Sequence, residues 1–224
     1  MDEKTGNTNF IWLTLALIGM LLTGAFTREL PDALTLQILE FSSVILMLVS
    51  LGSLSKNRGW LIRLATIIGI MLMVVLGKRV FGFQYFEYFY LSLLLLFFMS
   101  AAWLVGRGVL LTGSVDLNKI VGSVALYLLL GLIWAIFYTV LLEFSPEAIK
   151  GMEAGHWTDN LSIMTYFSFV TLATLGYGDI SPVTPVAQTL VILEAVTGMF
   201  YMAVVVASLI GGLKRGGSPL DSSH

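Results

Sequence analysis

The sequence predicts an all-α membrane protein with six membrane-spanning helices and one shorter helix that enters the membrane without crossing it. Of the 224 residues, 57% are hydrophobic and 12% are charged, and the mean hydropathy is +0.90. Soluble domains are about 45–50% apolar and about 25% charged. A chain of this size cannot bury so much apolar surface in its own core, so lipid must cover much of it.

Seven apolar runs alternate with polar breaks along the chain. A spanning helix needs about 20 apolar residues, with a range of about 17–25. The run at 161–171 is too short to span and fits a re-entrant helix buried in protein. The six predicted spans cover residues 10–26, 33–54, 60–76, 83–105, 119–142 and 186–213.

These segments group into two domains. The first four spans make a helical domain over residues 1–106, and residues 107–118 form a linker. The second domain, residues 119–213, holds an outer helix, the re-entrant helix, the loop after it and an inner helix. Residues 214–224 form a short tail that we expect on the cytoplasmic side.

Composition excludes several classes of function. The absence of cysteine rules out disulfides, thiolate metal sites and cysteine catalysis. The two histidines, His156 and His224, are far apart in the sequence, and a formal net charge of −2 does not indicate nucleic-acid binding. Because the sequence contains no catalytic constellation, we expect neither an enzyme nor a cofactor.

The most informative segment follows the re-entrant helix. Residues 171–179 read Thr-Leu-Ala-Thr-Leu-Gly-Tyr-Gly-Asp. Glycine adopts backbone conformations that other residues resist. A segment that alternates between such conformations can aim successive carbonyl oxygens at one axis, where they replace the water around a cation inside a membrane.

This segment resembles the filter of the potassium-channel pore family, usually written TxxTVGYG followed by Asp. One residue departs from that pattern, since Leu175 stands where the family most often has Val or Ile. The resemblance covers residues 119–213, whereas the first four spans match only six-span members in number. It implies that K⁺ binds along the filter, at Thr174, Leu175, Gly176, Tyr177 and Gly178.

The resemblance also implies supports around the filter. In the family, the carboxylate at Asp179 bonds to an aromatic residue of the pore helix, and alignment places Tyr166 there. The ring of Tyr177 is implied to pack against the pore helix, and Thr171 is counted as a further support. The carbonyl end of this helix favours a cation, and Asp159 or Asn160 is expected as its N-cap.

Two residues of the inner helix have alternative interpretations. Gly198 falls at the family's hinge glycine, yet a small residue for close helix packing is an equal alternative. A carboxylate near mid-membrane, such as Glu194, is costly and by default functional. It can reach Thr171 or Ser168 or be protonated, and the alternative is a buried polar contact that stabilises the assembly.

One filter segment per chain implies a homotetramer, because four pore loops must surround one axis. Four acidic residues precede or begin the pore helix and would be repeated around the outer mouth. They either raise the local cation concentration or form a solvated loop. These residues are Glu143, Glu147, Glu153 and Asp159.

Orientation follows from the basic residues near the span ends. With both termini cytoplasmic, eight of the twelve Lys and Arg residues lie inside, as expected for a plasma-membrane protein. The fourth span has no basic residue before Arg107, so it is not a voltage sensor of the usual kind.

The sequence thus predicts a passive, potassium-selective, homotetrameric channel. One alternative is a non-selective monovalent cation channel, because Leu175 alters the packing behind a carbonyl ring. A potassium-uptake transporter subunit and a non-conducting membrane scaffold are further alternatives. Transporters of that kind carry several degenerate pore loops in one chain, and this chain carries one intact segment.

Overall fold

The computed structural model describes residues 10–27, 38, 42–46, 48–49, 58–81, 85–110, 117–153 and 155–216. The predicted second span, at 33–54, lies largely outside these residues. In chain order the elements are α1 (Phe10–Thr27), α3 (Arg58–Phe81), α4 (Tyr85–Leu110), α5 (Leu117–Phe144), the 3₁₀ turn η1 (Pro146–Ala148), β1 (Ile149–Lys150), α6 (Trp157–Leu172), β2 (Ser181–Pro182) and α7 (Pro185–Gly216).

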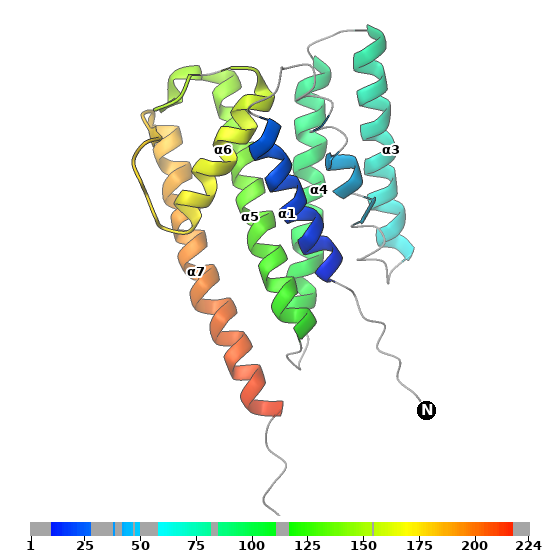
Figure 1. The fold of residues 1–224 in the computed structure, drawn as a ribbon, viewed down its shortest axis with the longest axis vertical. Helices are drawn as coiled ribbons and strands as arrows, with labels where there is room; N and C mark the ends of the chain where they lie inside the picture. Colours follow the sequence, from blue (N-terminus) through cyan, green and yellow to red (C-terminus); the bar gives the residue numbers. More distant parts are fainter. Residues whose placement is uncertain are drawn as a thin grey trace, which may run out of the picture.

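Helix α5 lies at the centre of the molecule. It contacts α4, α6, α1 and α7, and α3 packs against α4 at the far side (Figure 1). Its sequence is apolar on all sides, which is typical of a helix surrounded by others. Leu129, Ala135 and Tyr138 are fully buried along it. The core of the molecule is therefore built around the predicted outer helix.

The predicted all-helical membrane fold is confirmed. Among the described residues, three helices are long and apolar enough to cross a membrane: Glu87–Val109, Leu117–Phe144 and Pro185–Val205. The predicted first and third spans coincide with shorter apolar helices, Phe10–Phe26 and Ala65–Gly77.

The predicted linker over 107–118 is partly wrong, because α4 continues to Leu110 and α5 begins at Leu117. Gly106 and Gly108 do not end the helix. A Cβ at Gly108 would lie 3.1 Å from the Phe10 ring of α1, so the glycine lets the two helices approach closely. This packing offsets the low helix propensity of glycine, about 1 kcal/mol relative to alanine.

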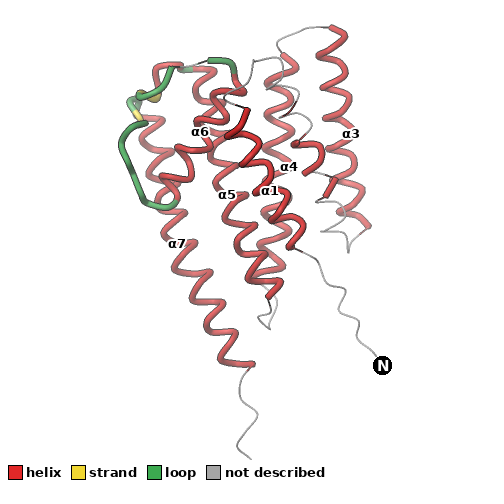
Figure 2. The backbone as a smooth tube through the Cα atoms, in the orientation of Figure 1, coloured by secondary structure: helices red, strands yellow, loops and turns green. Residues whose placement is uncertain are grey.

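Helix α6 is re-entrant in shape. Its 16 residues span about 24 Å, short of the roughly 30 Å of a hydrocarbon core. It starts at the end of the molecule that carries the loop 145–156. After α6 the chain reverses direction, and the following loop returns towards the same end (Figures 1 and 2). Helix α7 begins close to that end and extends past the other helices at the opposite end (Figure 1).

The predicted N-cap of α6 is wrong. The helix starts at Trp157, with His156 as an N-cap residue that makes no side-chain capping bond. Asn160 instead folds back onto Gly155, accepting from its amide and donating to its carbonyl, both at 3.0 Å. Asp159 lies in the first turn, where a negative charge interacts favourably with the helix dipole.

Candidate ion-binding site

The backbone of the filter segment alternates between two conformations. Thr174, Gly176 and Gly178 have φ of +58°, +57° and +79°, whereas the intervening Leu175 and Tyr177 do not take positive values. In an ordinary strand, successive residues face opposite sides. A left-handed conformation at every second residue turns the carbonyls towards one side, so the alternation expected from the sequence is present.

Thr174 carries local backbone strain, because residues other than glycine seldom adopt positive φ. Such conformations persist only where the surroundings enforce them. The end of α6 provides this restraint: the Thr174 amide donates to the Thr171 carbonyl at 2.9 Å, and the Leu175 amide donates to the Val170 carbonyl at 2.9 Å. The last turn of α6 thus sets the start of the filter.

The filter is open to solvent in the single chain. Leu175 is 58% exposed and Tyr177 is 67% exposed. The expected packing of the Tyr177 ring against the pore helix is therefore not found within the chain. The last backbone hydrogen bond between the described filter residues and α6 leaves from the Gly176 amide, and beyond it the segment contacts α6 through the side chain of Asp179.

The outer end of the filter is tied to α6 by one side-chain bond. The Tyr166 hydroxyl donates to Asp179 Oδ2 at 2.7 Å, so the contact expected from the resemblance is present. This hydrogen bond lowers the pKa of Asp179 below its usual value, and backbone amides add to the effect. The same bond raises the pKa of Tyr166. The ionised carboxylate is the form that the contact favours.

A two-stranded antiparallel sheet, which the sequence did not predict, holds the filter exit from the other side. Strand β1 pairs with β2, with Ile149 opposite Pro182 and Lys150 opposite Ser181. Next to β1, Gly151 has φ +90°, and a Cβ there would lie 1.9 Å from the Asp179 carbonyl oxygen. The segment after α5 therefore packs directly on the backbone of the filter exit.

Glu194 is fully buried behind the filter. Its Oε2 accepts from the Tyr138 hydroxyl of α5 at 2.6 Å, and its Oε1 lies 2.5 Å from Ser168 Oγ of α6. Of the two partners considered from the sequence, the structure has Ser168 rather than Thr171. Tyr138 was missed, although a tyrosine in an apolar helix, one of two in α5, is a signal that could have found it.

Gly198 lies where α7 meets the end of α6. A Cβ at this position would stand 2.1 Å from the Leu172 carbonyl oxygen. Helix α7 is continuous through Gly198, from Pro185 to Gly216. Of the two interpretations, close packing thus has a direct structural basis, and the role as a gating hinge stays a prediction.

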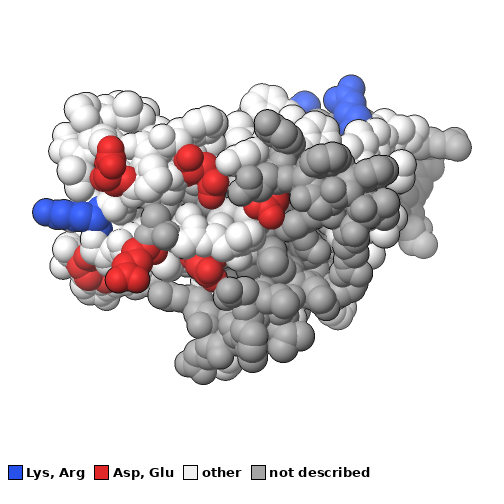
Figure 3. All heavy atoms as spheres, turned by 90° about the horizontal axis from the view of Figure 1, so that it is seen from above, with Lys and Arg blue, Asp and Glu red and all other residues white. Residues whose placement is uncertain are grey.

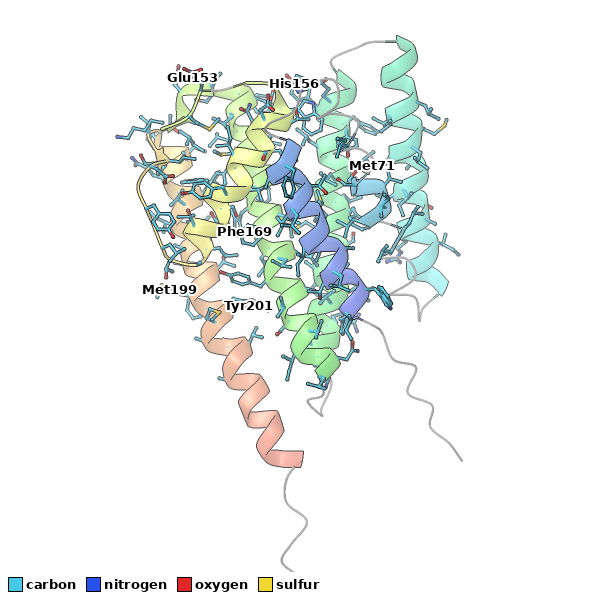
Figure 4. The ribbon with its side chains drawn as sticks, viewed as in Figure 1. Met71, Glu153, His156, Phe169, Met199 and Tyr201 are labelled. Atoms are coloured by element: carbon cyan, nitrogen blue, oxygen red, sulfur yellow. The ribbon has the colours of Figure 1, made fainter. Side chains whose placement is uncertain are left out.

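Small residues and aromatic rings also join α5 to its neighbours. A Cβ at Gly131 would lie 2.6 Å from the ring of Phe169, which stands between α6 and α5 (Figure 4). Tyr201 reaches from α7 towards α5, where its hydroxyl donates to the Ser123 carbonyl. Pore helix and inner helix are therefore both fastened to α5.

Acidic side chains gather at the end of the molecule where the filter exits (Figure 3). Of the predicted outer-mouth residues, Glu147 and Glu153 are exposed. Glu143 is half-buried and accepts a long hydrogen bond, 3.4 Å, from Tyr88. Asp159 is half-buried at the start of α6. Of these four acidic residues, the two with exposed side chains are thus Glu147 and Glu153.

The described residues contain no group of three or more His, Cys, Asp or Glu side chains that could hold a metal ion. The oxygens along residues 174–178 are the backbone carbonyls and the hydroxyls of Thr174 and Tyr177. Such ligands suit a hard cation that must enter and leave.

The comparison with known proteins agrees with this geometry. Residues 124–214 match the profile of a family described as ion channels. This segment is therefore similar to ion channels. It contains most of α5, all of α6, the filter and nearly all of α7, which are the elements that surround Glu194 and Gly198.

Two of the curated relatives that the chain matches are potassium channels. The inward rectifier potassium channel Kirbac3.1 of Paramagnetospirillum magnetotacticum is 40% identical over 85 residues, or 38% of this chain and 26% of the relative. The voltage-gated potassium channel Kch of Escherichia coli is 37% identical over 84 residues, or 37% of this chain and 20% of the relative. The chain therefore matches about a quarter or less of each relative's length, and the resemblance to the potassium-channel family is confirmed over these matched stretches.

Proposed function

We propose that this chain forms a homotetrameric channel that conducts K⁺ selectively and passively across the cell membrane. The observation that carries the proposal is the alternating backbone at Thr174, Gly176 and Gly178, because it turns successive carbonyls to one side. The potassium channels among the relatives of the pore segment support the same function.

The filter residues would act through their backbones. The carbonyls of Thr174, Leu175, Gly176 and Tyr177 would form successive oxygen rings, with the Thr174 hydroxyl at the inner end and Gly178 at the exit turn. Helix α6 ends at Leu172, directly before this segment. Its carbonyl end would favour a cation at the pore centre by up to about 1–2 kcal/mol.

The uneven burial of the helices supports assembly around this axis. In the single chain, 17% of the most apolar 18-residue stretch of α7 is buried, whereas 56% of the corresponding stretch of α5 is buried. The filter segment is exposed on the same side of the molecule as α7 (Figure 2). A single pore loop cannot enclose an ion, so four copies would bring these faces together.

Orientation and gating follow from charge. The start of α1 and the end of α7 share one end of the molecule, opposite the acidic filter exit (Figure 1). With both termini cytoplasmic, the exit faces outwards, which suits the excess of basic residues inside. Helix α4 contains Arg107 as its single basic residue, so we do not expect gating by an arginine ladder.

A non-selective monovalent cation channel is the second candidate. The observation that favours it is Leu175, a larger side chain than the usual Val, which is 58% exposed where a neighbouring subunit would pack. A transporter subunit is less well supported, because the chain carries one intact filter segment.

A flux assay on purified protein in liposomes tests this proposal. We expect K⁺ efflux that Ba²⁺ blocks, and the same flux from Leu175→Val, which restores the commoner residue. Flux of Na⁺ equal to that of K⁺ in the wild type, with K⁺ preference gained in Leu175→Val, would favour the non-selective channel. No flux of either ion from correctly assembled protein would contradict both.

A further inference from the structure

Counting hydrogen-bond donors and acceptors shows which of the buried groups Ser168, Tyr138 and Glu194 carry protons. Ser168 Oγ lies 2.8 Å from the Gly131 carbonyl oxygen of α5 and 2.5 Å from Glu194 Oε1 of α7. Tyr138 Oη lies 2.6 Å from Glu194 Oε2. Ser168, Tyr138 and Glu194 are each 0% exposed, so all three contacts are buried.

A hydroxyl has one proton to donate, and a backbone carbonyl can only accept. The contact with Gly131 therefore takes the Ser168 proton. The contact between Ser168 and Glu194 then needs its own proton, and a carboxylate has none. Both contacts are hydrogen bonds only if Glu194 carries a proton on Oε1, while Oε2 accepts from Tyr138.

The surroundings of Glu194 favour the same state. A charge buried without a partner of opposite sign is costly. The ionisable side chains of α5 that interact with Glu194 are Tyr138 and Tyr127, both of which are neutral when protonated. On α6 the ionisable residues are Asp159, in the first turn, and Tyr166, whose hydroxyl donates to Asp179. No salt bridge to Glu194 occurs within the described residues.

We infer that Glu194 is held as a neutral carboxylic acid that donates to Ser168, forming a chain of hydrogen bonds from α7 through α6 to the Gly131 carbonyl of α5. This chain of bonds fixes the pore helix between the two long helices, six residues before Thr174, the first residue expected to bind K⁺. Glu194 is thus a positioning residue, acting on the filter through Ser168.

The inference has a consequence for ionisation. If Glu194 loses its proton, Ser168 must turn its single proton towards Oε1, and its bond to Gly131 is lost. The proton on Glu194 therefore decides whether α6 is bonded to both neighbours or to α7 alone. This link between the helices is independent of the ion that passes through the filter.

Infrared spectroscopy of the full chain in lipid vesicles tests the protonation. We expect the C=O stretching band of a carboxylic acid at neutral pH, shifted in D₂O and lost in Glu194→Gln. The matched control is Glu153→Gln, an exposed residue, which should remove carboxylate absorption and leave the acid band unchanged. Loss of carboxylate absorption, rather than of the acid band, in Glu194→Gln would overturn the inference.

Two further measurements keep the test decisive if Glu194→Gln assembles poorly. Ser168→Ala and Tyr138→Phe should each shift the acid band, because each removes one partner of the carboxyl group. Thermal unfolding should separate Glu194→Gln, which keeps a donor for Ser168 and an acceptor for Tyr138, from a less stable Glu194→Ala. Equal losses in Gln and Ala variants, or an unmoved band, would contradict the assignment whether or not the protein conducts K⁺.

Discussion

Gly198 of the inner helix lies against the Leu172 carbonyl of the pore helix, so closely that a Cβ would stand 2.1 Å from the oxygen. Atoms of a real side chain do not approach a carbonyl oxygen this closely. Since Leu172 ends α6 just before the filter, Gly198 sets how near the inner helix comes to the filter from behind. Its lack of a side chain is used for packing, whatever its part in gating.

Gly198→Ala should therefore destabilise the assembled protein. Neither the Leu172 backbone nor α7 can move aside freely, so we expect a loss of at least about 1–3 kcal/mol in the free energy of unfolding. Gly69→Ala in α3 is the matched control, because a Cβ there meets nothing within 4 Å. That control should be neutral or more stable, by about 0.5–1 kcal/mol. Thermal unfolding in detergent measures both, and equal effects would contradict the packing account.

Tyr166→Phe should raise the pKa of Asp179. The Tyr166 hydrogen bond is the largest cause of the lowered pKa, and the remaining backbone amide bonds are weaker causes. A depressed pKa means that the contact is complete at neutral pH and is lost as the pH falls through the folded-state value. Titration of the Asp179 carboxyl carbon by NMR should show an upward shift in the variant. An unchanged titration would mean that the bond has no energetic role.

Gly176→Ala should abolish selective conduction through backbone strain. A Cβ at this position would have no atom of the same chain within 4 Å. However, φ is +57°, a conformation that costs residues other than glycine about 1–2 kcal/mol. The loss should recur in each subunit of a tetramer. Gly19→Ala, in an open and ordinary helical position, should conduct as the wild type does. Selective conduction by Gly176→Ala would indicate that the filter does not need the left-handed conformation.

The exposed acids at the outer mouth should raise conductance at low ionic strength. We expect Glu147→Gln and Glu153→Gln together to lower single-channel conductance in dilute KCl, because they remove charge that concentrates cations near the entrance. The difference should fade above about 1 M salt, where the Debye length is roughly 3 Å. Glu143→Gln, which alters a half-buried residue, should have a smaller effect. A deficit that persists at high salt would point to a structural cause.

The helices and the filter could be predicted from the sequence because their signals are local. The length of an apolar run fixes whether a helix can cross a bilayer, and the glycine spacing at 176 and 178 fixes where the backbone can alternate. The bond from Tyr166 to Asp179 was also accessible, since the resemblance aligns both positions.

The missed features depend on contacts between segments far apart in the chain. Nothing near Ile149 in the sequence signals that it pairs with Pro182, since each strand has two residues. Tyr138 meets Glu194 because α5 packs against α7 as well as against α6. The ring of Tyr177 was expected against its own pore helix, but its side chain is 67% exposed in the single chain, where the proposed neighbouring subunits would cover it.

The reversal potential of single channels, recorded from the purified full chain in planar bilayers with KCl on one side and NaCl on the other, tests the central proposal most directly. Carbonyl rings set by the alternation at residues 174, 176 and 178 predict a reversal potential far from zero, with the NaCl side positive, because K⁺ permeates and Na⁺ does not. A reversal potential near zero, with Na⁺ carrying current as readily as K⁺, would contradict a potassium-selective pore.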